Sequence, residues 1–177
     1  ENMLNEAVKH LKGELSEEDT FTTALDVNVD AYIPDSYIAN EYHKLDIYKR
    51  IAAIESEEEM DDMIEELIDR FGDIPKKVEL LLEVARLKNL AHQAYVTEVT
   101  QKGVTYTFRM YEKAKIRVDK IPELLEQMGG NMTFRHAEPA QFICRLQGGR
   151  RRFSGTILEI TREVLEEMCV LREEEEK

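Results

Sequence analysis

The 177-residue sequence has little of several residue types, and each scarcity excludes a class of protein. Two cysteines, Cys144 and Cys169, are too few for a disulfide framework in a chain of this length, which favours a reducing, cytoplasmic environment. No apolar run approaches the roughly 18 residues that a membrane-spanning helix needs. The 24 lysines and arginines stand against 37 acidic residues, and the net charge of −13 argues against direct nucleic-acid binding through a basic face.

Hydrophobic residues make up 42% of the chain, which is enough for a core, so we expect a folded protein. The length suits one domain with an appended element. Residues 1–12 have the apolar spacing of a short amphipathic helix, and residues 14–23 form an acidic connector without periodicity. Because the chain starts at Glu1, inside that expected helix, we interpret it as an excerpt of a longer protein.

Hydrophobic periodicity predicts a strand, three helices, a hairpin, a helix, two strands and a last helix. The expected ranges are 24–33, 37–54, 57–71, 75–94, 95–110, 120–128, 132–136, 142–147 and 156–172, followed by a charged tail at 173–177. This order predicts an α+β fold, a helix-rich domain over 24–172 with a small antiparallel or mixed sheet, preceded by a separate N-terminal helix.

The helix expected at 37–54 has Asp35 or Ser36 as its expected N-cap, and its apolar positions include Tyr42 and Leu45. The third, over 75–94, is apolar around most of its circumference, so we expect it to be central and mostly buried.

Candidates for catalytic or metal chemistry are few. The segment His136-Ala137-Glu138 matches half of a zinc deaminase signature, but the Pro-Cys-x-x-Cys half is missing. Cys144 and Cys169 fall in apolar patterns, where we expect buried small hydrophobic residues rather than nucleophiles. We therefore expect no enzymatic activity, metal or cofactor in this domain, and an enzyme with a metal near His136 is the alternative from another class.

Arg150, Arg151 and Arg152 follow two glycines and precede the last expected helix. A helix N-terminus beside three arginines can hold an anion, although the order of residues is wrong for a nucleotide-binding loop. The other interpretation is a turn whose arginines pair with the carboxylates of this acidic protein. Together with Arg145, the run is the only candidate in the sequence for DNA contact.

The helix expected at 57–71 carries an acidic row. Glu59 forms a capping box with Ser56, and the row continues along one line of the helix through Asp62, Glu66 and Asp69. Like charges at these spacings repel, so helix stability does not explain the row. Two interpretations remain open at this point, a solvated face and a docking surface for a cationic partner.

Three segments resemble a known family. They are Ala-Leu-Asp-Val-Asn-Val-Asp-Ala-Tyr-Ile-Pro-Asp-Ser-Tyr-Ile (24–38), Lys-Leu-Asp-Ile-Tyr-Lys-Arg-Ile-Ala (44–52) and Glu-Leu-Ile-Asp-Arg-Phe-Gly-Asp-Ile-Pro (66–75). In order and spacing they are similar to the C-terminal domain of Mfd, the bacterial transcription-repair coupling factor, and a looser similarity extends to about residue 172. Residues 1–13 resemble the end of the motor region that precedes this domain.

The resemblance implies a regulatory domain. Members of this family are ATP-driven translocases on double-stranded DNA that displace stalled RNA polymerase and recruit the nucleotide excision repair protein UvrA. Their C-terminal domain is non-catalytic, docks on the N-terminal UvrB-like module of the same protein, masks its UvrA-binding surface and restrains the motor. The alternative is a binding module that contacts RNA polymerase, UvrA or DNA directly.

The same resemblance carries over two residues of the acidic row. In the family, acidic positions of the Glu-Leu-Ile-Asp-Arg-Phe-Gly motif meet arginines of the UvrB-like module, and these positions correspond to Glu66 and Asp69. Glu59 and Asp62 match no family motif, and helical spacing alone assigns them to the same docking surface. The resemblance thus favours docking over a solvated face.

Overall fold

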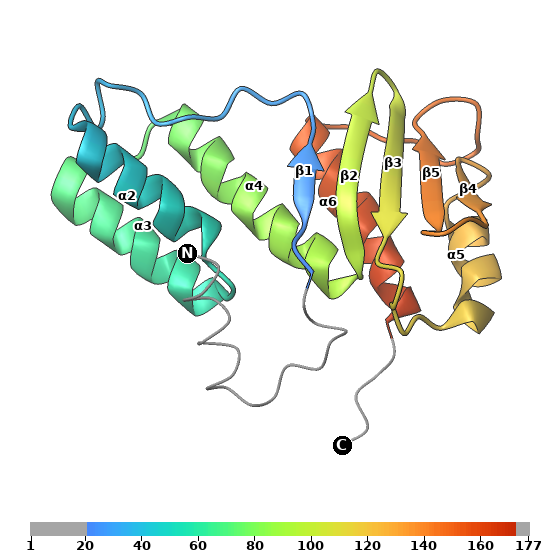
Figure 1. Cartoon of the computed structure of the whole chain (residues 1–177). Helices are drawn as coiled ribbons and strands as arrows, with labels where there is room; N and C mark the ends of the chain where they lie inside the picture. The colour runs from blue at the N-terminus through green and yellow to red at the C-terminus, as the bar shows by residue number, and fades with distance from the viewer. Residues whose placement is uncertain (1–20, 173–177) are drawn as a thin grey trace.

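The computed structural model describes residues 21–172 (Figure 1). The helix expected at 1–12, the connector as far as residue 20 and the tail at 173–177 lie outside the described residues. The α-helices are α2 (Glu41–Ala52), α3 (Glu57–Phe71), α4 (Lys76–Gln93), α5 (Ile121–Gln127) and α6 (Ile157–Met168). The strands are β1 (Ala24–Asp26), β2 (Val96–Lys102), β3 (Thr105–Met110), β4 (Met132–Arg135) and β5 (Gln141–Arg145). Two short 3₁₀ helices are η2 (Val118–Lys120) and η3 (Cys169–Leu171).

The described elements form a five-stranded sheet with helices behind it and at both ends. The strand order is β1-β2-β3-β5-β4. β1 pairs with β2 in parallel and the other neighbours pair antiparallel, so the sheet is mixed. Figure 1 shows α4 and α6 behind the sheet, α2 and α3 side by side at the β1 end, and α5 at the β4 end. The predicted α+β class and the predicted order of elements are confirmed.

The helix α4 contributes to two hydrophobic cores, which confirms that it is central. Near its start, Val78 and Leu82 pack with the buried side chains of α2 and α3. Near its end, Leu87 and Ala91 pack with the inner face of the sheet and with α6. Each buried aliphatic side chain of this size contributes roughly 1.5–3 kcal/mol. The α2–α3 pair is therefore held to the sheet by packing along α4, which fixes the outer face of the pair in space.

The strand predicted at 24–33 is shorter than its alternating pattern indicated. Side chains alternate between more and less exposed as far as Ile33, but only Ala24–Asp26 pairs with β2. The pairing ends because the next backbone donors have other acceptors. The N–H of Asn28 donates to the side-chain oxygen of Gln101, at 2.8 Å, and the N–H of Val29 donates to the carbonyl of Val27, at 2.9 Å. The alternating pattern therefore predicts correctly which side chains of 24–33 are less exposed, but it overestimates how many residues pair with β2.

The first predicted helix also starts later than expected. Asn40, not Asp35 or Ser36, is the N-cap, and its side chain accepts the backbone N–H of His43 at 3.0 Å. Residues 34–37 form a turn before it. Ile47 and Ile51 form the buried face of α2, and Tyr42 and Leu45, which the sequence groups with the apolar positions of this helix, are exposed.

Candidate docking surface

The four carboxylates of the acidic row lie on α3, which carries eight acidic residues and one arginine. Glu59 is engaged at the start of this helix. Its backbone N–H donates to Ser56 Oγ at 3.1 Å, and its carboxylate accepts the N–H of Glu55 at 3.0 Å. The capping interaction predicted between Ser56 and Glu59 is confirmed, so this carboxylate contributes to the helix start.

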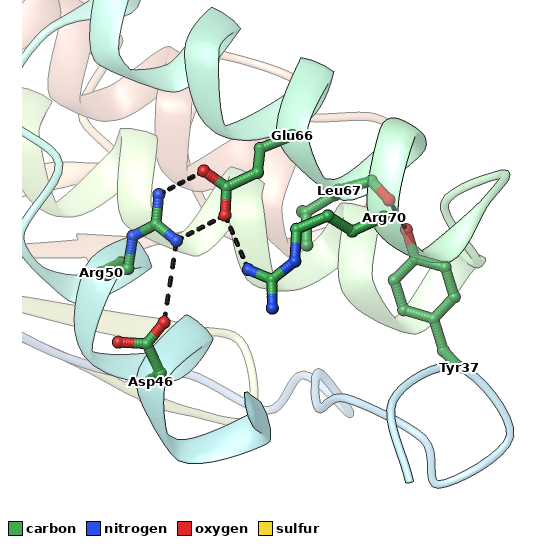
Figure 2. A network of polar contacts seen from close by, with 6 residues as sticks. All are labelled: Tyr37, Asp46, Arg50, Glu66, Leu67 and Arg70. Atoms are coloured by element: carbon green, nitrogen blue, oxygen red, sulfur yellow. Dashed lines mark hydrogen bonds and ion pairs between the residues drawn. The ribbon is translucent and has the colours of Figure 1, made fainter. Parts of the chain in front are cut away.

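Glu66 lies between two arginines (Figure 2). Arg50 on α2 donates from both terminal nitrogens to its carboxylate, at 2.5 and 2.6 Å, and Arg70 donates to the same carboxylate at 2.9 Å. Asp46 lies 3.7 Å from the Arg50 guanidinium. The hydrogen bonds from Arg50 and then Arg70 lower the pKa of Glu66 from its ordinary value to about 2. Glu66 is ionised at neutral pH, and its charge is neutralised inside the domain.

Asp62 and Asp69 have different surroundings. Both are exposed, and neither makes an ion pair or a side-chain hydrogen bond with another residue in the range 21–172. They lie about one turn on either side of Glu66, and further exposed carboxylates flank them on the same helix at Glu58, Asp61 and Glu65. Asp62 and Asp69 are therefore the members of the predicted row whose carboxylates have neither an ion pair nor a hydrogen bond among the described residues.

The adjoining face of α2 presents two apolar side chains to solvent. Tyr42 is 85% exposed and Leu45 is 54% exposed. Tyr42, Asp46 and Arg50 are spaced by four residues, so they follow one line along α2. The ion pair from Arg50 to Glu66 joins this line to the acidic row of α3. An aromatic side chain, a neutralised ion-pair network and free carboxylates thus form one continuous surface across the two helices.

The two helices run in opposite directions along this surface. The ring of His43 lies 6.5 Å from the ring of Phe71, so the start of α2 is next to the end of α3. Tyr42 and Asp69 are consequently at the same end of the surface. Sequence reasoning missed Tyr42 as a surface residue, because helical spacing only grouped it with the other apolar positions of this helix. It missed Arg50, because only the antiparallel packing of the two helices brings Arg50 to α3.

The arginine run lies on the connection between β5 and α6. Arg151 is integrated into the fold, whereas Arg150 and Arg152 are exposed and have no side-chain partner among the residues that the structure describes. The partners of the Arg151 side chain include the carbonyl oxygen of Gln127 and the carboxylates of Glu163 and Glu167, at 3.0, 3.3 and 3.5 Å. Pairing with the protein's own carboxylates thus holds for Arg151, and the anion site stays a prediction for the other two.

The remaining candidate residues for metal binding or catalysis are His136 and the two cysteines. Within residues 21–172, no group of three His, Cys, Asp or Glu side chains is arranged to hold a metal ion, and His136 is exposed. Cys144 is fully buried, as predicted, and burial raises the pKa of its thiol to about 11. Cys169 is half-buried, and burial raises its pKa too. No helix in the described part of the chain is long and apolar enough to cross a membrane.

Comparisons with known proteins identify the family. The TRCF domain matches residues 27–121. The transcription-repair-coupling factor of Bacillus subtilis is 39% identical over 129 residues, which are 72% of this chain and 11% of that protein. The factor of Staphylococcus haemolyticus is also 39% identical, over 138 residues, which are 77% of this chain and 11% of that protein. The chain therefore spans about a tenth of the length of the curated relatives that it matches.

A solved structure supports the same assignment. The crystal structure of the C-terminal domain of transcription-repair coupling factor superimposes with a TM-score of 0.59 and is 26% identical in sequence. The match covers 85% of this chain and 89% of the solved chain. We conclude that the chain belongs to the TRCF domain family, as a C-terminal domain of a transcription-repair coupling factor.

Proposed function

We propose that this chain is a non-catalytic regulatory domain that docks on the N-terminal UvrB-like module of its own protein. Docking masks the UvrA-binding surface of that module and restrains the DNA translocase until RNA polymerase is engaged. The protein works in the cytoplasm, in nucleotide excision repair coupled to transcription. The proposal rests on family membership and on the surface formed by α2 and α3.

The observation that carries the proposal is the pair of unneutralised carboxylates, Asp62 and Asp69. Several arginines of the fold are engaged with carboxylates, as Arg50 and Arg70 are with Glu66. A helix that keeps two exposed aspartates in line beside a neutralised glutamate gains nothing in stability from them, since neighbouring like charges repel. Basic side chains of a partner would relieve that repulsion, and complementary charge gives such a contact its specificity.

Glu66 has a second role in this proposal. Its carboxylate fixes the rotamers of Arg50 and Arg70, so the surface between α2 and α3 is ordered before a partner arrives. A partner arginine that reaches Glu66 shares the carboxylate with these two residues. Glu66 is therefore a positioning residue as well as a contact, and Asp69 is the better site for testing the contact alone.

Tyr42 and Leu45 supply the apolar part of the docking surface. Interfaces usually have an apolar or aromatic centre with charged residues around it, and aromatic residues are frequent hot spots. Tyr42 lies at the end of the surface where Asp69 is exposed, so a partner arginine near Asp69 can also stack on its ring. This arrangement explains why an 85% exposed tyrosine lies on α2 rather than a polar residue.

A tether strengthens such a contact. Because the two modules belong to one chain, the effective concentration of the docking surface is high, and a modest interface stays closed. A partner that binds the open state more tightly shifts the equilibrium and exposes the masked surface.

The test is a calorimetric titration of the isolated UvrB-like module with this chain. We expect binding that weakens as salt is raised and that falls about tenfold in Asp69→Arg. Glu112→Arg is the matched control, because Glu112 is exposed on a different part of the domain. Equal affinities for the unaltered chain and for Asp69→Arg would show that the acidic row is a solvated face.

A further inference from the structure

The outer face of the sheet carries three arginines that no carboxylate neutralises. They are Arg109 on β3, Arg135 on β4 and Arg145 on β5, and all three are exposed. Within the described part of the chain, none of their side chains forms an ion pair or a hydrogen bond. Free arginines are unexpected on a chain with a net charge of −13, which has carboxylates in excess.

The register of the strands places these arginines together. Arg109 lies opposite Gln141 on β5, and Gln141 lies opposite Arg135 on β4. Neighbouring strands are about 4.8 Å apart, so the backbones of Arg109 and Arg135 are separated by about 10 Å. Arg145 is four residues beyond Gln141 on the same strand, about 13 Å away, and faces the same side because side chains alternate along a strand. Together they define an arginine face.

The rest of this face is polar except for one isoleucine. The other outward positions of β3, β4 and β5 are occupied by Thr105, Thr107, Thr133, Gln141 and Ile143. No acidic residue stands among them. Glu98 on β2 is opposite Arg109, but its carboxylate accepts the hydroxyl of Thr100 at 3.1 Å and makes no ion pair with Arg109. Figure 1 shows α4 and α6 behind the sheet, so no described helix covers this side.

We propose that the arginine face binds the phosphate backbone of double-stranded DNA, without preference for sequence. Guanidinium, hydroxyl and amide donors on a flat surface are the groups that contact phosphates. A protein partner would require an apolar centre, and the face offers only Ile143. Single-stranded DNA would require aromatic side chains for stacking, and the aromatic residues Phe108 and Phe142 are buried on the inner face.

The net charge of the chain does not oppose this contact. The acidic helix α3 lies beyond the β1 edge of the sheet (Figure 1). The strand nearest to it that carries an arginine of this face is β3, which is two strand spacings, about 10 Å, from β1, so the carboxylates of α3 are further than this from the arginine face. Exposed charges further apart than a Debye length of about 8 Å are largely screened at physiological salt. Duplex DNA presents about one phosphate charge per 1.7 Å of axis, so a face about 13 Å long meets more phosphates than it has arginines.

The test measures fluorescence anisotropy of a labelled duplex of about 20 base pairs, titrated with the chain at several KCl concentrations. Three phosphate contacts predict weak binding. The logarithm of the association constant should fall linearly with log[KCl], with a slope of about −2.7. In Arg109→Gln/Arg135→Gln we expect a slope of about −0.9 and roughly tenfold weaker binding at low salt. Lys76→Gln/Arg172→Gln loses the same charge at exposed residues outside the face and is expected to bind within about twofold of the unaltered chain.

Four results would overturn the proposal. They are no anisotropy change for the unaltered chain at low salt, equal losses in the two double variants, tighter binding of single-stranded oligothymidine than of the duplex, and binding of polyglutamate in preference to the duplex. The arginine face is separate from the α2–α3 surface, so each of these results leaves the docking proposal untouched. Loss of docking in Asp69→Arg, in turn, leaves the arginine face untouched.

Discussion

Replacing Glu66 by glutamine isolates the ion-pair network between α2 and α3. The substitution keeps the shape of the side chain and removes the charge that accepts three hydrogen bonds from Arg50 and Arg70. A hydrogen bond to a charged group contributes about 1.5–3 kcal/mol when it is buried. These side chains are 32 to 40% exposed, so solvent screens the interaction, and we expect a loss of about 1 kcal/mol in the free energy of unfolding.

The contribution of Glu66 to the free energy of unfolding depends on pH. Because folding lowers the pKa of Glu66 to about 2, its contribution is fully present above the ordinary pKa of a glutamate, near 4.5, and is lost as the pH falls through about 2. Urea unfolding of both proteins, followed by circular dichroism, should therefore show the full difference at pH 7 and a shrinking one below about pH 4.5. Glu65→Gln, an exposed neighbour, is the control and should change stability by less than about 0.5 kcal/mol. A difference that does not depend on pH, or an equal loss in the control, would refute the reasoning.

Three further predictions concern single side chains. Tyr37→Phe removes a hydroxyl whose one proton is shared between two carbonyls near the end of α3, at 3.1 and 2.9 Å, so thermal unfolding should show a loss of about 1 kcal/mol. Cys144 should resist a thiol reagent at pH 8 until urea unfolds the chain, since burial raises its pKa to about 11, and prompt labelling of Cys144 in the folded chain would contradict this. Arg151→Ala should cost about 1–2 kcal/mol because it breaks contacts with α5 and α6, whereas Arg152→Ala should cost less than about 0.5 kcal/mol.

The sequence predicts those parts of the fold that depend on local periodicity. The position of α3, the central place of α4 and the hairpin of β2 and β3 follow from apolar spacing and turn residues, and each is confirmed. The length of the strand at 24–33 is overestimated because alternation indicates only which side of a segment is buried. It does not indicate whether the backbone has a hydrogen-bonding partner in a neighbouring strand, and here the side chain of Gln101 accepts the hydrogen bond from the N–H of Asn28.

The candidate sites depend on packing between distant elements, which periodicity does not contain. Helical spacing grouped four carboxylates as equivalent, but Arg50 approaches from another helix and neutralises only Glu66. Strand register likewise brings Arg109 and Arg135 to one face, although they are far apart in sequence. The net charge, which argued against DNA, is an average over surfaces of opposite sign and does not describe either of them.

The central claim is that docking of this domain masks the UvrA-binding surface. The most direct measurement is UvrA binding to the full-length protein that contains this chain, compared with the same protein carrying Asp62→Arg and Asp69→Arg. The account predicts that the two charge reversals open the protein and raise its affinity for UvrA toward that of a protein lacking the domain. Unchanged UvrA affinity, in a variant whose domain folds normally, would contradict it.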